Sequence, residues 1–412
     1  MASDKKPGVL ARARFRRQPA PVQFAFGDRI DFVNGAHWDE VTAHRGSLLR
    51  RDYFRALETA LPDNLDVRYA LLYQAQRPVA ALAMQLVEVA GARLSKAPDE
   101  PRKGLRGLAA RGAAELGKRL NPRVLVVGNL LTYGSHGIAI RPGCEQDPAI
   151  WHGIGEAAYR VRRAEKHGGS ADFVLVKDLC ARELQHSGLL RDLGYRPVET
   201  EPNMVLSVRD GWSSHDDYLG ALVGKYRKNV RSRVLAPIEA AGVQRVAIDD
   251  VAAVAPRLHE LYLAVHENAA VRPVTLGADY WPALARGAAG RVRFGALRRG
   301  EALLGFVVTL RDDDDTAIAY HIGFDRQAAQ ELPLYLRLLH CSIADAIEMG
   351  ARRVSFGRTA LEPKAMLGAK PEPLHVWVRH RQPVLNKLMR GLLGRVHHDE
   401  APVRNPFPDD GQ

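Results

Sequence analysis

Apolar residues along the chain follow two spacings, and each spacing predicts a different kind of element. Stretches that repeat at every third or fourth position predict helices, whereas short stretches that are continuously apolar or alternate predict strands. Two pairs of apolar stretches are joined by short polar turns and predict β-hairpins, at residues 66–74 with 78–89 and at residues 292–297 with 302–310. A helical pattern precedes each hairpin, at residues 38–61 and 254–267, so the chain is expected to mix helices and strands.

The two halves of the chain repeat one order of predicted elements after the hairpin. That order is a strand, a helix, a strand, a short helix and a closing strand. The first half has these at residues 124–131, 149–166, 172–177, 187–193 and 203–208, and the second half at 316–324, 332–349, 353–357, 363–367 and 375–379. Each short helix ends at a glycine, Gly194 or Gly368, as a helix C-cap does. The matching order predicts a tandem duplication.

The duplication sets the predicted fold class and the domain boundaries. Two α/β (α+β) domains, each a mixed and largely antiparallel sheet flanked by helices, are expected at residues 31–209 and 210–395. A basic flexible arm is expected at 1–30 and a Pro-rich flexible tail at 396–412. Residues 93–123 carry nine basic and three acidic residues and predict an inserted lobe, either a solvated surface helix or a site for a polyanion.

Composition narrows the class of protein. The chain has 412 residues, of which 46% are apolar and 26% charged, so it is expected to fold as a globular protein. Its net charge of +12 favours anionic partners, whether a tRNA or, peripherally, an anionic membrane surface. Three widely spaced cysteines predict neither disulfides nor a thiolate metal site. With no secretory signal and no apolar run long enough to span a bilayer, we expect a cytoplasmic protein without a transmembrane segment.

Several enzyme classes lack their signatures in this sequence. The chain contains no Gly-x-x-x-x-Gly-Lys-Ser/Thr, Gly-x-Ser-x-Gly or His-Glu-x-x-His motif, which argues against P-loop, hydrolase-elbow and zincin chemistry. The carboxylate run Asp312–Asp315 lies between two predicted strands and is interpreted as a solvated turn rather than a divalent-cation site. No metal site is predicted.

Two polar aromatic residues stand on an otherwise apolar strand at residues 317–324. A buried polar group needs a partner, so Tyr320 and His321 are either satisfied core residues or reactive groups. As a reactive group, His321 would take a proton from an attacking amine, and Tyr320 or Tyr335 would return one to a leaving group.

The second half contains two further concentrations of charge. After the strand at 353–357, Arg358, Glu362 and Lys364 stand near the strand's carboxyl end, where they would either cap the next helix or bind a phosphate or an oxyanion. The helical stretch 216–241 buries an apolar face, and a basic cluster projects beside that face. The cluster consists of Lys225, Arg227, Lys228 and Arg231.

These second-half motifs resemble the FemAB-like branch of the GNAT acyltransferase superfamily. The resemblance covers about residues 210–385 and lies in the segments Lys225–Arg231, Tyr320–Phe324, Phe356–Thr359 and Pro363–Gly368. The last segment is similar to the family's Lys-x-x-Phe-Gly element, with Leu367 in place of the aromatic residue. The family is built from tandem GNAT-type domains, in agreement with the duplication.

The resemblance implies an N-acyltransferase that moves an acyl or aminoacyl group from an activated thioester or ester to an amine. Catalytic roles are expected for His321, Tyr320, Tyr335, Arg358 and Lys364, with oxyanion support from a strand N–H between Tyr320 and Gly323. Donor or acceptor binding is expected from Lys225, Arg227, Lys228, Arg231, Glu362 and Gly323.

The identity of the acyl donor stays open among acyl-CoA, an acyl-carrier protein and aminoacyl-tRNA, and no tightly bound cofactor is expected. CoA-dependent relatives hold pyrophosphate with a Gly-rich loop, but residues 326–331 of this chain contain no glycine. One alternative is an aminoacyl-tRNA-dependent transferase acting on a peptide or cell-envelope precursor. Another is a catalytically inactive GNAT-like RNA-binding or scaffold protein.

Overall fold

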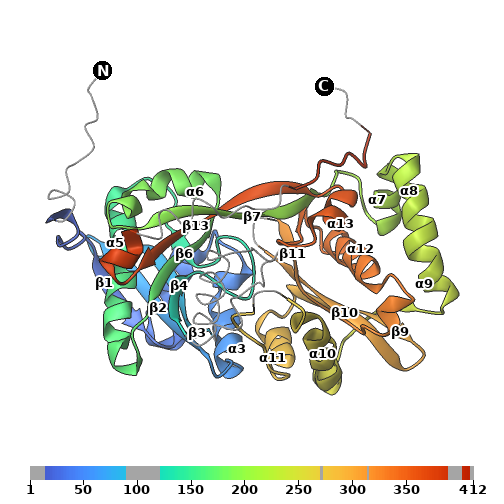
Figure 1. Ribbon diagram of the computed structural model, residues 1–412, viewed down its shortest axis with the longest axis horizontal. Coiled ribbons are helices and arrows are strands. Elements are labelled where there is room, and N and C mark those ends of the chain that lie inside the picture. Colours follow the sequence, from blue (N-terminus) through green and yellow to red (C-terminus); the bar gives the residue numbers. More distant parts are fainter. Residues whose placement is uncertain (1–13, 90–120, 270–271, 313–314, 388–400, 409–412) are drawn as a thin grey trace, which may run out of the picture.

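The computed structural model describes residues 14–89, 121–269, 272–312, 315–387 and 401–408 (Figure 1). Most of the predicted insertion at 93–123 lies outside these ranges. The strands are β1 (Gln23–Gly27), β2 (Leu65–Gln74), β3 (Arg77–Glu88), β4 (Arg123–Val127), β5 (Ile138–Ile140), β6 (Phe173–Leu179), β7 (Arg196–Ser207), β8 (Gln244–Ala247), β9 (Val292–Arg299), β10 (Ala302–Arg311), β11 (Thr316–Phe324), β12 (Arg353–Ser355) and β13 (Lys370–His380).

Helices cover the sheet on both sides. The α-helices are α2 (Gly35–Thr42), α3 (Arg51–Thr59), α5 (Pro148–Ala164), α6 (Ala181–His186), α7 (His215–Ala221), α8 (Gly224–Val230), α9 (Ala236–Ala240), α10 (Val251–His266), α11 (Tyr280–Gly287), α12 (Leu334–Glu348) and α13 (Leu361–Met366). Short 3-10 helices are η1 (Ile30–Phe32), η2 (Ser47–Leu49), η4 (Glu165–Gly168), η5 (Ser187–Arg191) and η7 (Ala328–Gln330), and η6 (Arg231–Leu235) is a π-helix.

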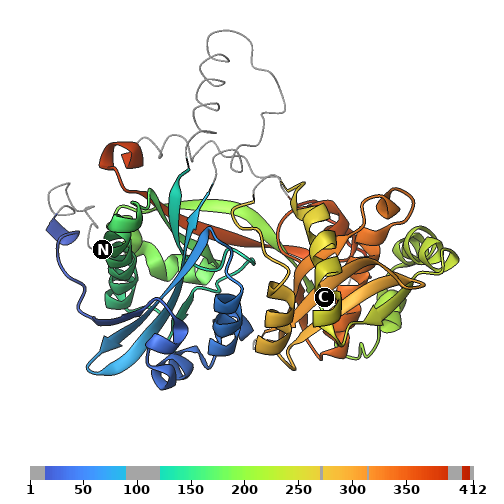
Figure 2. The same ribbon diagram turned by 90° about the horizontal axis from the view of Figure 1, so that it is seen from below.

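Among the described residues, the strands join into one sheet of 13, in the order β1-β2-β3-β4-β6-β13-β7-β12-β11-β10-β9-β8, with β5 paired to β3. The closing strands of the two halves are exchanged: β13 lies beside β6 of the first half, and β7 lies beside β12 of the second half. Figure 2 shows β7 and β13 running side by side across the molecule. Each half therefore completes its sheet with a strand from the other half.

The repeated order of elements predicted from the sequence is present in both halves. In each half the central strand pairs in parallel with the strand after the long helix, β4 with β6 and β11 with β12, and the remaining pairs are antiparallel. The mixed, largely antiparallel fold class is thus confirmed.

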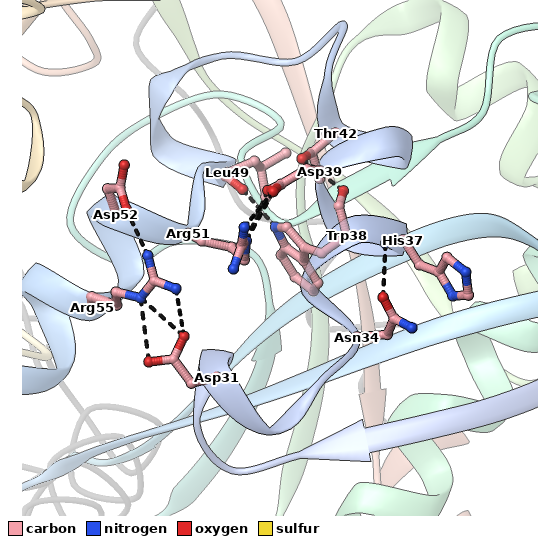
Figure 3. A network of polar contacts seen from close by, with 10 residues as sticks. All are labelled: Asp31, Asn34, His37, Trp38, Asp39, Thr42, Leu49, Arg51, Asp52 and Arg55. Carbon is pink, nitrogen blue, oxygen red and sulfur yellow. Dashed lines mark hydrogen bonds and ion pairs between the residues drawn. The ribbon is translucent and has the colours of Figure 1, made fainter.

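Two predicted long helices are interrupted. The stretch 38–61 breaks into α2, η2 and α3 around Gly46, where a Cβ atom would collide with the carboxylate of Asp312. Side-chain contacts hold α2 against η2 and α3 across this break. Trp38 Nε1 donates to Leu49 O at 2.8 Å, and Arg51 forms an ion pair with Asp39 (Figure 3). The stretch 216–241 breaks between α7 and α8, and the π-helix η6 joins α8 to α9.

The two predicted flexible ends are partly structured. Residues 23–27 of the predicted arm form β1, because their amides and carbonyls pair with β2 at the edge of the sheet. In the predicted tail, Phe407 packs on Trp212 with ring centroids 5.6 Å apart and covers Gly368, and Arg404 pairs with Glu362. The arm and the tail are therefore shorter than predicted.

Candidate active site

The chain leaves strand β12 through a turn with unusual backbone geometry. Gly357, Thr359 and Ala360 have φ angles of 73°, 64° and 46°. For residues that carry a Cβ atom, such angles cost free energy and persist only where neighbouring contacts hold them. We call residues 357–360 the β12 turn.

The side chain of Lys364 fixes the β12 turn through hydrogen bonds to its backbone. Its ammonium donates to Arg358 O at 2.5 Å and to Gly357 O at 3.2 Å, and the residue is 4% exposed. Burial lowers the pKa of Lys364 to about 7, against an opposing effect of the Glu201 carboxylate. A lysine with this pKa is divided between its charged and neutral forms near neutral pH.

Arg358 joins the β12 turn to the first half of the chain. Its guanidinium forms an ion pair with the fully buried Asp178 and lies 5.3 Å from the ring centroid of Tyr133. Asp178 also accepts hydrogen bonds from Lys177 and from the N–H of Gly134. The turn is therefore fixed by side chains from both halves.

A second polar anchor lies on the exchanged strand β7. Asn203 Oδ1 accepts from the N–H of Gly357 and from the hydroxyl of Ser355, each at 3.0 Å. The Asn203 side chain is nearly buried, so these two bonds satisfy its carbonyl oxygen. The strand exchange thereby places an amide against the start of the turn.

A basic cavity of about 590 Å³ lies on one side of the β12 turn, between α8, the π-helix and α13. Its lining holds four cationic side chains and one carboxylate, and the carboxylate is paired with one of the cations at 2.8 Å. The lining residues are Lys225, Tyr226, Lys228, Asn229, Ser232, Arg233, Glu362, Met366 and Arg404. The excess of positive charge suits an anionic ligand.

A second cavity, of about 280 Å³, lies between the halves on the other side of the turn. We call it the inter-half cavity. Ser355 and Asn203 line it from the sheet, and Tyr133, His136 and Asp178 line it from the first half. The ring of Tyr133 also covers Gly357, where a Cβ atom would lie 2.4 Å from the ring. The β12 turn therefore connects Ser355, which lines the inter-half cavity, to Glu362, which lines the basic cavity.

His136 presents an acceptor nitrogen inside the inter-half cavity. Burial, reinforced by Arg45 and Lys177, lowers its pKa to about 4, so the ring is neutral near pH 7. Nε2 lies 3.1 Å from Tyr133 O, and because a carbonyl only accepts, Nε2 carries the proton. Nδ1 then keeps its lone pair, and it faces Asp312 Oδ2 at 3.9 Å.

Tyr320 and His321 lie in a different place, in the apolar core between the halves. A β-bulge at Tyr320 interrupts the pairing of β11 with β10, and the rings of Tyr320 and His321 lie 4.2 Å apart. The Tyr320 hydroxyl bonds to the hydroxyls of Tyr53, at 3.1 Å, and Tyr280, at 2.6 Å.

The environment of His321 is aromatic. The rings of Tyr262, Tyr280 and Trp281 all meet it edge-on. Burial lowers the pKa of His321 to about 3, and its Nε2 is buried without a hydrogen-bond partner among the described residues. His321 therefore lies in the aromatic core, whereas Arg358 and Lys364 lie at the β12 turn, and the role of His321 as a base stays a prediction.

The remaining predicted residues are distributed around the second half. Tyr335 lies in the first turn of α12 near Phe324, and burial raises its pKa to about 12. Gly323 lies beneath α10, where a Cβ atom would lie 2.7 Å from backbone atoms of Leu261 and Tyr262. A side chain would not fit in this contact, which explains why residue 323 is a glycine.

Part of the predicted basic cluster also lies elsewhere than the basic cavity. Arg227 donates to Gly220 O at 2.9 Å, and Arg231 is exposed, and neither lines the cavity. Lys225, Lys228 and Glu362, by contrast, meet there as predicted donor-binding residues. Whether they bind a donor stays a prediction at this stage.

Sequence reasoning missed Asp178, His136, Asn203 and Arg404. The first three belong to the first half, and nothing in their local pattern pairs them with a turn more than 150 residues away. The signal that could have found Asp178 was its place at the end of a predicted strand, where open α/β sheets gather functional groups.

The loop before α12 holds its own amide groups. Asp325 Oδ1 accepts from the N–H of Gln327 and Ala328, at 2.9 and 3.0 Å. The N–H groups of residues 329–332 and 334 donate to carbonyls of the same loop. These donors are therefore engaged, and two carboxylates, Asp325 and Glu331, stand beside them.

Comparison with known proteins agrees with this architecture. Residues 224–365 match the family model described as an acetyltransferase (GNAT) domain. No curated protein sequence matches the chain. In the part of the chain that the structure describes, no helix is both long and apolar enough to cross a membrane.

Solved structures align with the chain at low sequence identity. FemX aligns with a TM-score of 0.54 and 10% identity, over 87% of this chain and 98% of FemX. A tandem GNAT protein from the clavulanic acid biosynthesis pathway aligns with a TM-score of 0.49 and 13% identity, over 88% of this chain and 99% of the other. The FemX match and the family match confirm the predicted resemblance to FemAB-like GNAT proteins, and the class of enzyme is an acyltransferase.

Proposed function

We propose that the protein is an N-acyltransferase that binds an anionic activated donor in the basic cavity and an amine acceptor in the inter-half cavity. The observation that carries this proposal is the position of the β12 turn. The strand residue Ser355 before the turn lines the inter-half cavity, Glu362 and Met366 of α13 after the turn line the basic cavity, and Lys364 donates to Arg358 O within the turn. A donor carbonyl and an acceptor amine that enter from opposite sides would meet there.

The proposed reaction forms an amide bond and breaks the thioester or ester bond of the donor. The acceptor nitrogen attacks the donor carbonyl, its proton is removed, and the leaving sulfur or oxygen receives a proton. Lys364, with a pKa of about 7, and Arg358 supply positive charge where the oxyanion develops. The acceptor amine would donate hydrogen bonds to His136 Nδ1 and Asp312 Oδ2 from one side of this pair of acceptors, and the pair would take the proton that the nitrogen loses.

Two features of the chain bear on the identity of the donor: the loop before α12 and the charge of the basic cavity. Because the amides of the loop before α12 are engaged by their own carbonyls and by Asp325, they are poorly suited to hold the pyrophosphate of CoA. The four cations of the basic cavity suit phosphate groups approaching between α8 and α13. These features favour an aminoacyl-tRNA ester or a carrier-protein thioester over acyl-CoA.

A donor panel tests the proposal. Purified protein is incubated with acyl-CoA, acyl-carrier protein or aminoacyl-tRNA and a mixture of primary amines, and amide products are identified by mass spectrometry. We expect amide from one of the last two donors. The double variant Lys225→Glu/Lys228→Glu should slow transfer by about 10- to 100-fold, since two charge-assisted contacts become repulsive.

The control for this variant reverses equal charge away from the cavity. Arg298→Glu/Arg299→Glu changes two exposed arginines at the tip of the β9–β10 hairpin and should leave transfer within about twofold. Absence of amide from every donor would contradict the proposal, and so would equal loss of transfer in both double variants.

The salt dependence of donor binding separates the two favoured donors. Phosphate contacts along tRNA release counterions, so the logarithm of its affinity should fall linearly with the logarithm of salt concentration, at about 0.7 to 0.9 per contact. A carrier-protein thioester offers one phosphopantetheine phosphate and should show a much shallower slope.

A further inference from the structure

We infer that the first half of the chain binds a single-stranded polynucleotide on the face formed by residues 14–20, α5 and β13. Five arginines and one exposed tyrosine gather on this face, which we call the arginine face. They are Arg16, Arg17, Arg162, Arg163, Arg379 and Tyr159. The inference is independent of the donor site proposed above, which lies in the second half.

The arginine face is hollow. A cavity of about 490 Å³ opens between residues 16–19, the exposed side of α5 and the end of β13. Arg16 reaches across it and donates from Nε to Asp192 O at 2.7 Å, while its guanidinium lies on Gly194. The segment that carries Arg16 and Arg17 is thus docked on the first half, and Phe15 packs on His152 at 4.8 Å.

Like charges face one another on this surface. Arg162 and Arg379 lie close enough that Arg379 adds to the effect of burial in lowering the pKa of Arg162. Both also act on the buried hydroxyl of Tyr195, and the Arg379 guanidinium lies 5.7 Å from the Tyr195 ring centroid. Two guanidinium groups in this arrangement favour an anion between them.

Four of the five arginines are not paired with nearby carboxylates among the described residues. Glu156, in the lining of the cavity, accepts from Arg160 at 2.6 and 2.9 Å and from the N–H of Ala20. Within the part of the chain that the structure describes, Arg17, Arg162, Arg163 and Arg379 form no ion pair with a carboxylate. The positive charge of the face is available to phosphates.

An exposed aromatic ring stands among these charges. Tyr159 is 40% exposed, and the guanidinium carbons of Arg162 and Arg163 lie 5.4 and 6.0 Å from its ring centroid. A ring flanked by arginines at the rim of a cavity offers a stacking platform for an unpaired base, while the arginines contact the backbone. A cavity rimmed by arginines and an exposed ring suits a polynucleotide better than a flat membrane surface.

Binding of labelled oligonucleotides tests the inference. Fluorescein-labelled 12-nucleotide oligouridylate and its oligothymidylate counterpart are titrated with the full chain between 50 and 300 mM KCl, and anisotropy is followed. Arg17→Glu/Arg163→Glu should weaken binding at least about tenfold and reduce the salt slope by about 1.4, the value for two lost phosphate contacts. Tyr159→Ala should weaken binding about 5-fold or more with an unchanged slope.

Three comparisons make the test decisive. Arg298→Glu/Arg299→Glu carries the same change of charge on the β9–β10 hairpin and should bind within twofold of the unaltered chain. Equal weakening by both double variants, or binding of the unaltered chain to vesicles with 20% phosphatidylglycerol but not to either oligonucleotide, would overturn the inference. A preference between the RNA and DNA probes identifies the sugar.

An assay of acyl transfer from a small donor distinguishes failure of this inference from failure of the proposed function. Aminoacyl or acyl thioesters without a polynucleotide bypass the arginine face, so Arg17→Glu/Arg163→Glu should transfer from them at the unaltered rate. Loss of oligonucleotide binding with retained transfer supports the arginine face alone. Retained binding in a protein that transfers from no donor would refute the enzyme proposal and leave the polynucleotide site standing.

Discussion

The two halves share one order of elements but differ at the end of the strand that follows the long helix, which is β6 in the first half and β12 in the second. In the first half β6 pairs with β4 over residues 173–176 and continues to Leu179 beside β13. In the second half β12 pairs with β11 over three residues only and then enters the β12 turn. After the early end of β12, the turn leads from Ser355 at the inter-half cavity to Glu362 at the basic cavity.

This difference shows how the two halves of a duplicated fold can contribute different residues to one site. The second half supplies the strained turn and Lys364, and the first half supplies the buried carboxylate of Asp178 that receives Arg358. Because strands β7 and β13 are exchanged, neither half completes its sheet alone. Substitutions confined to one half can therefore separate the two contributions.

The largest expected effect on stability follows from removing Arg358. Arg358→Ala leaves Asp178 buried with Lys177 as its remaining cationic partner, and breaking a buried pair of this kind costs about 3 kcal/mol. Urea unfolding measures the change. Arg381→Ala, which breaks the more exposed pair with Asp172, should cost below about 1 kcal/mol, and equal costs would contradict the special role of the inter-half pair.

Lys364 and the partly buried Lys177 offer the next comparison. Lys364→Met removes the donor to Gly357 O and Arg358 O and should slow acyl transfer by about 100-fold, as loss of an oxyanion-stabilising group does. Lys177→Met removes a donor to Thr132 O in the first half and should act mainly on stability. If Lys177→Met slowed transfer as much as Lys364→Met, the assignment of chemistry to the second half would be wrong.

A smaller effect is expected in the core between the halves. Tyr320→Phe removes the hydroxyl that links Tyr53 of the first half to Tyr280 of the second. The loss should cost about 1–3 kcal/mol of unfolding free energy, because two buried hydroxyls lose a partner. Transfer at a temperature where the variant is folded discriminates the roles, since a proton donor would lose activity and a structural link would keep it.

The smallest expected effect is a dependence of stability on pH. Folding lowers the pKa of Lys364 from its usual 10.5 to about 7, so between these values the unfolded chain binds more protons than the folded chain. Stability from this group therefore rises as pH increases from 7, with a slope of at most about 1.4 kcal/mol per pH unit. Urea unfolding at pH 7 and 8 should show the rise, and Lys364→Met should lack it.

The sequence sufficed for the duplication, the hairpins and the long helix of each half, but not for the breaks in the stretches 38–61 and 216–241. Lys225 and Lys228 of α8 line one cavity with Glu362, and their role in donor binding stays a prediction. Local pattern could not reveal the strand exchange, because β7 and β13 have the same character as any other closing strand. It also could not show that Asp178 receives Arg358.

The position of His321 has a specific cause. Strand alternation alone would send Tyr320 and His321 to opposite faces, but the β-bulge at Tyr320 brings both rings against Tyr280. A bulge of one residue leaves no mark in the apolar pattern, since the surrounding strand reads the same with or without it.

Photo-crosslinking of the donor tests the central claim most directly. A donor analogue with a diazirine in its acyl chain is irradiated with the protein, and the labelled peptides are identified by mass spectrometry. The proposal predicts adducts in residues 224–233 and 357–366, lost in Lys225→Glu/Lys228→Glu and kept in Arg298→Glu/Arg299→Glu. Adducts confined to the aromatic core around His321, with none at the β12 turn or the basic cavity, would contradict it.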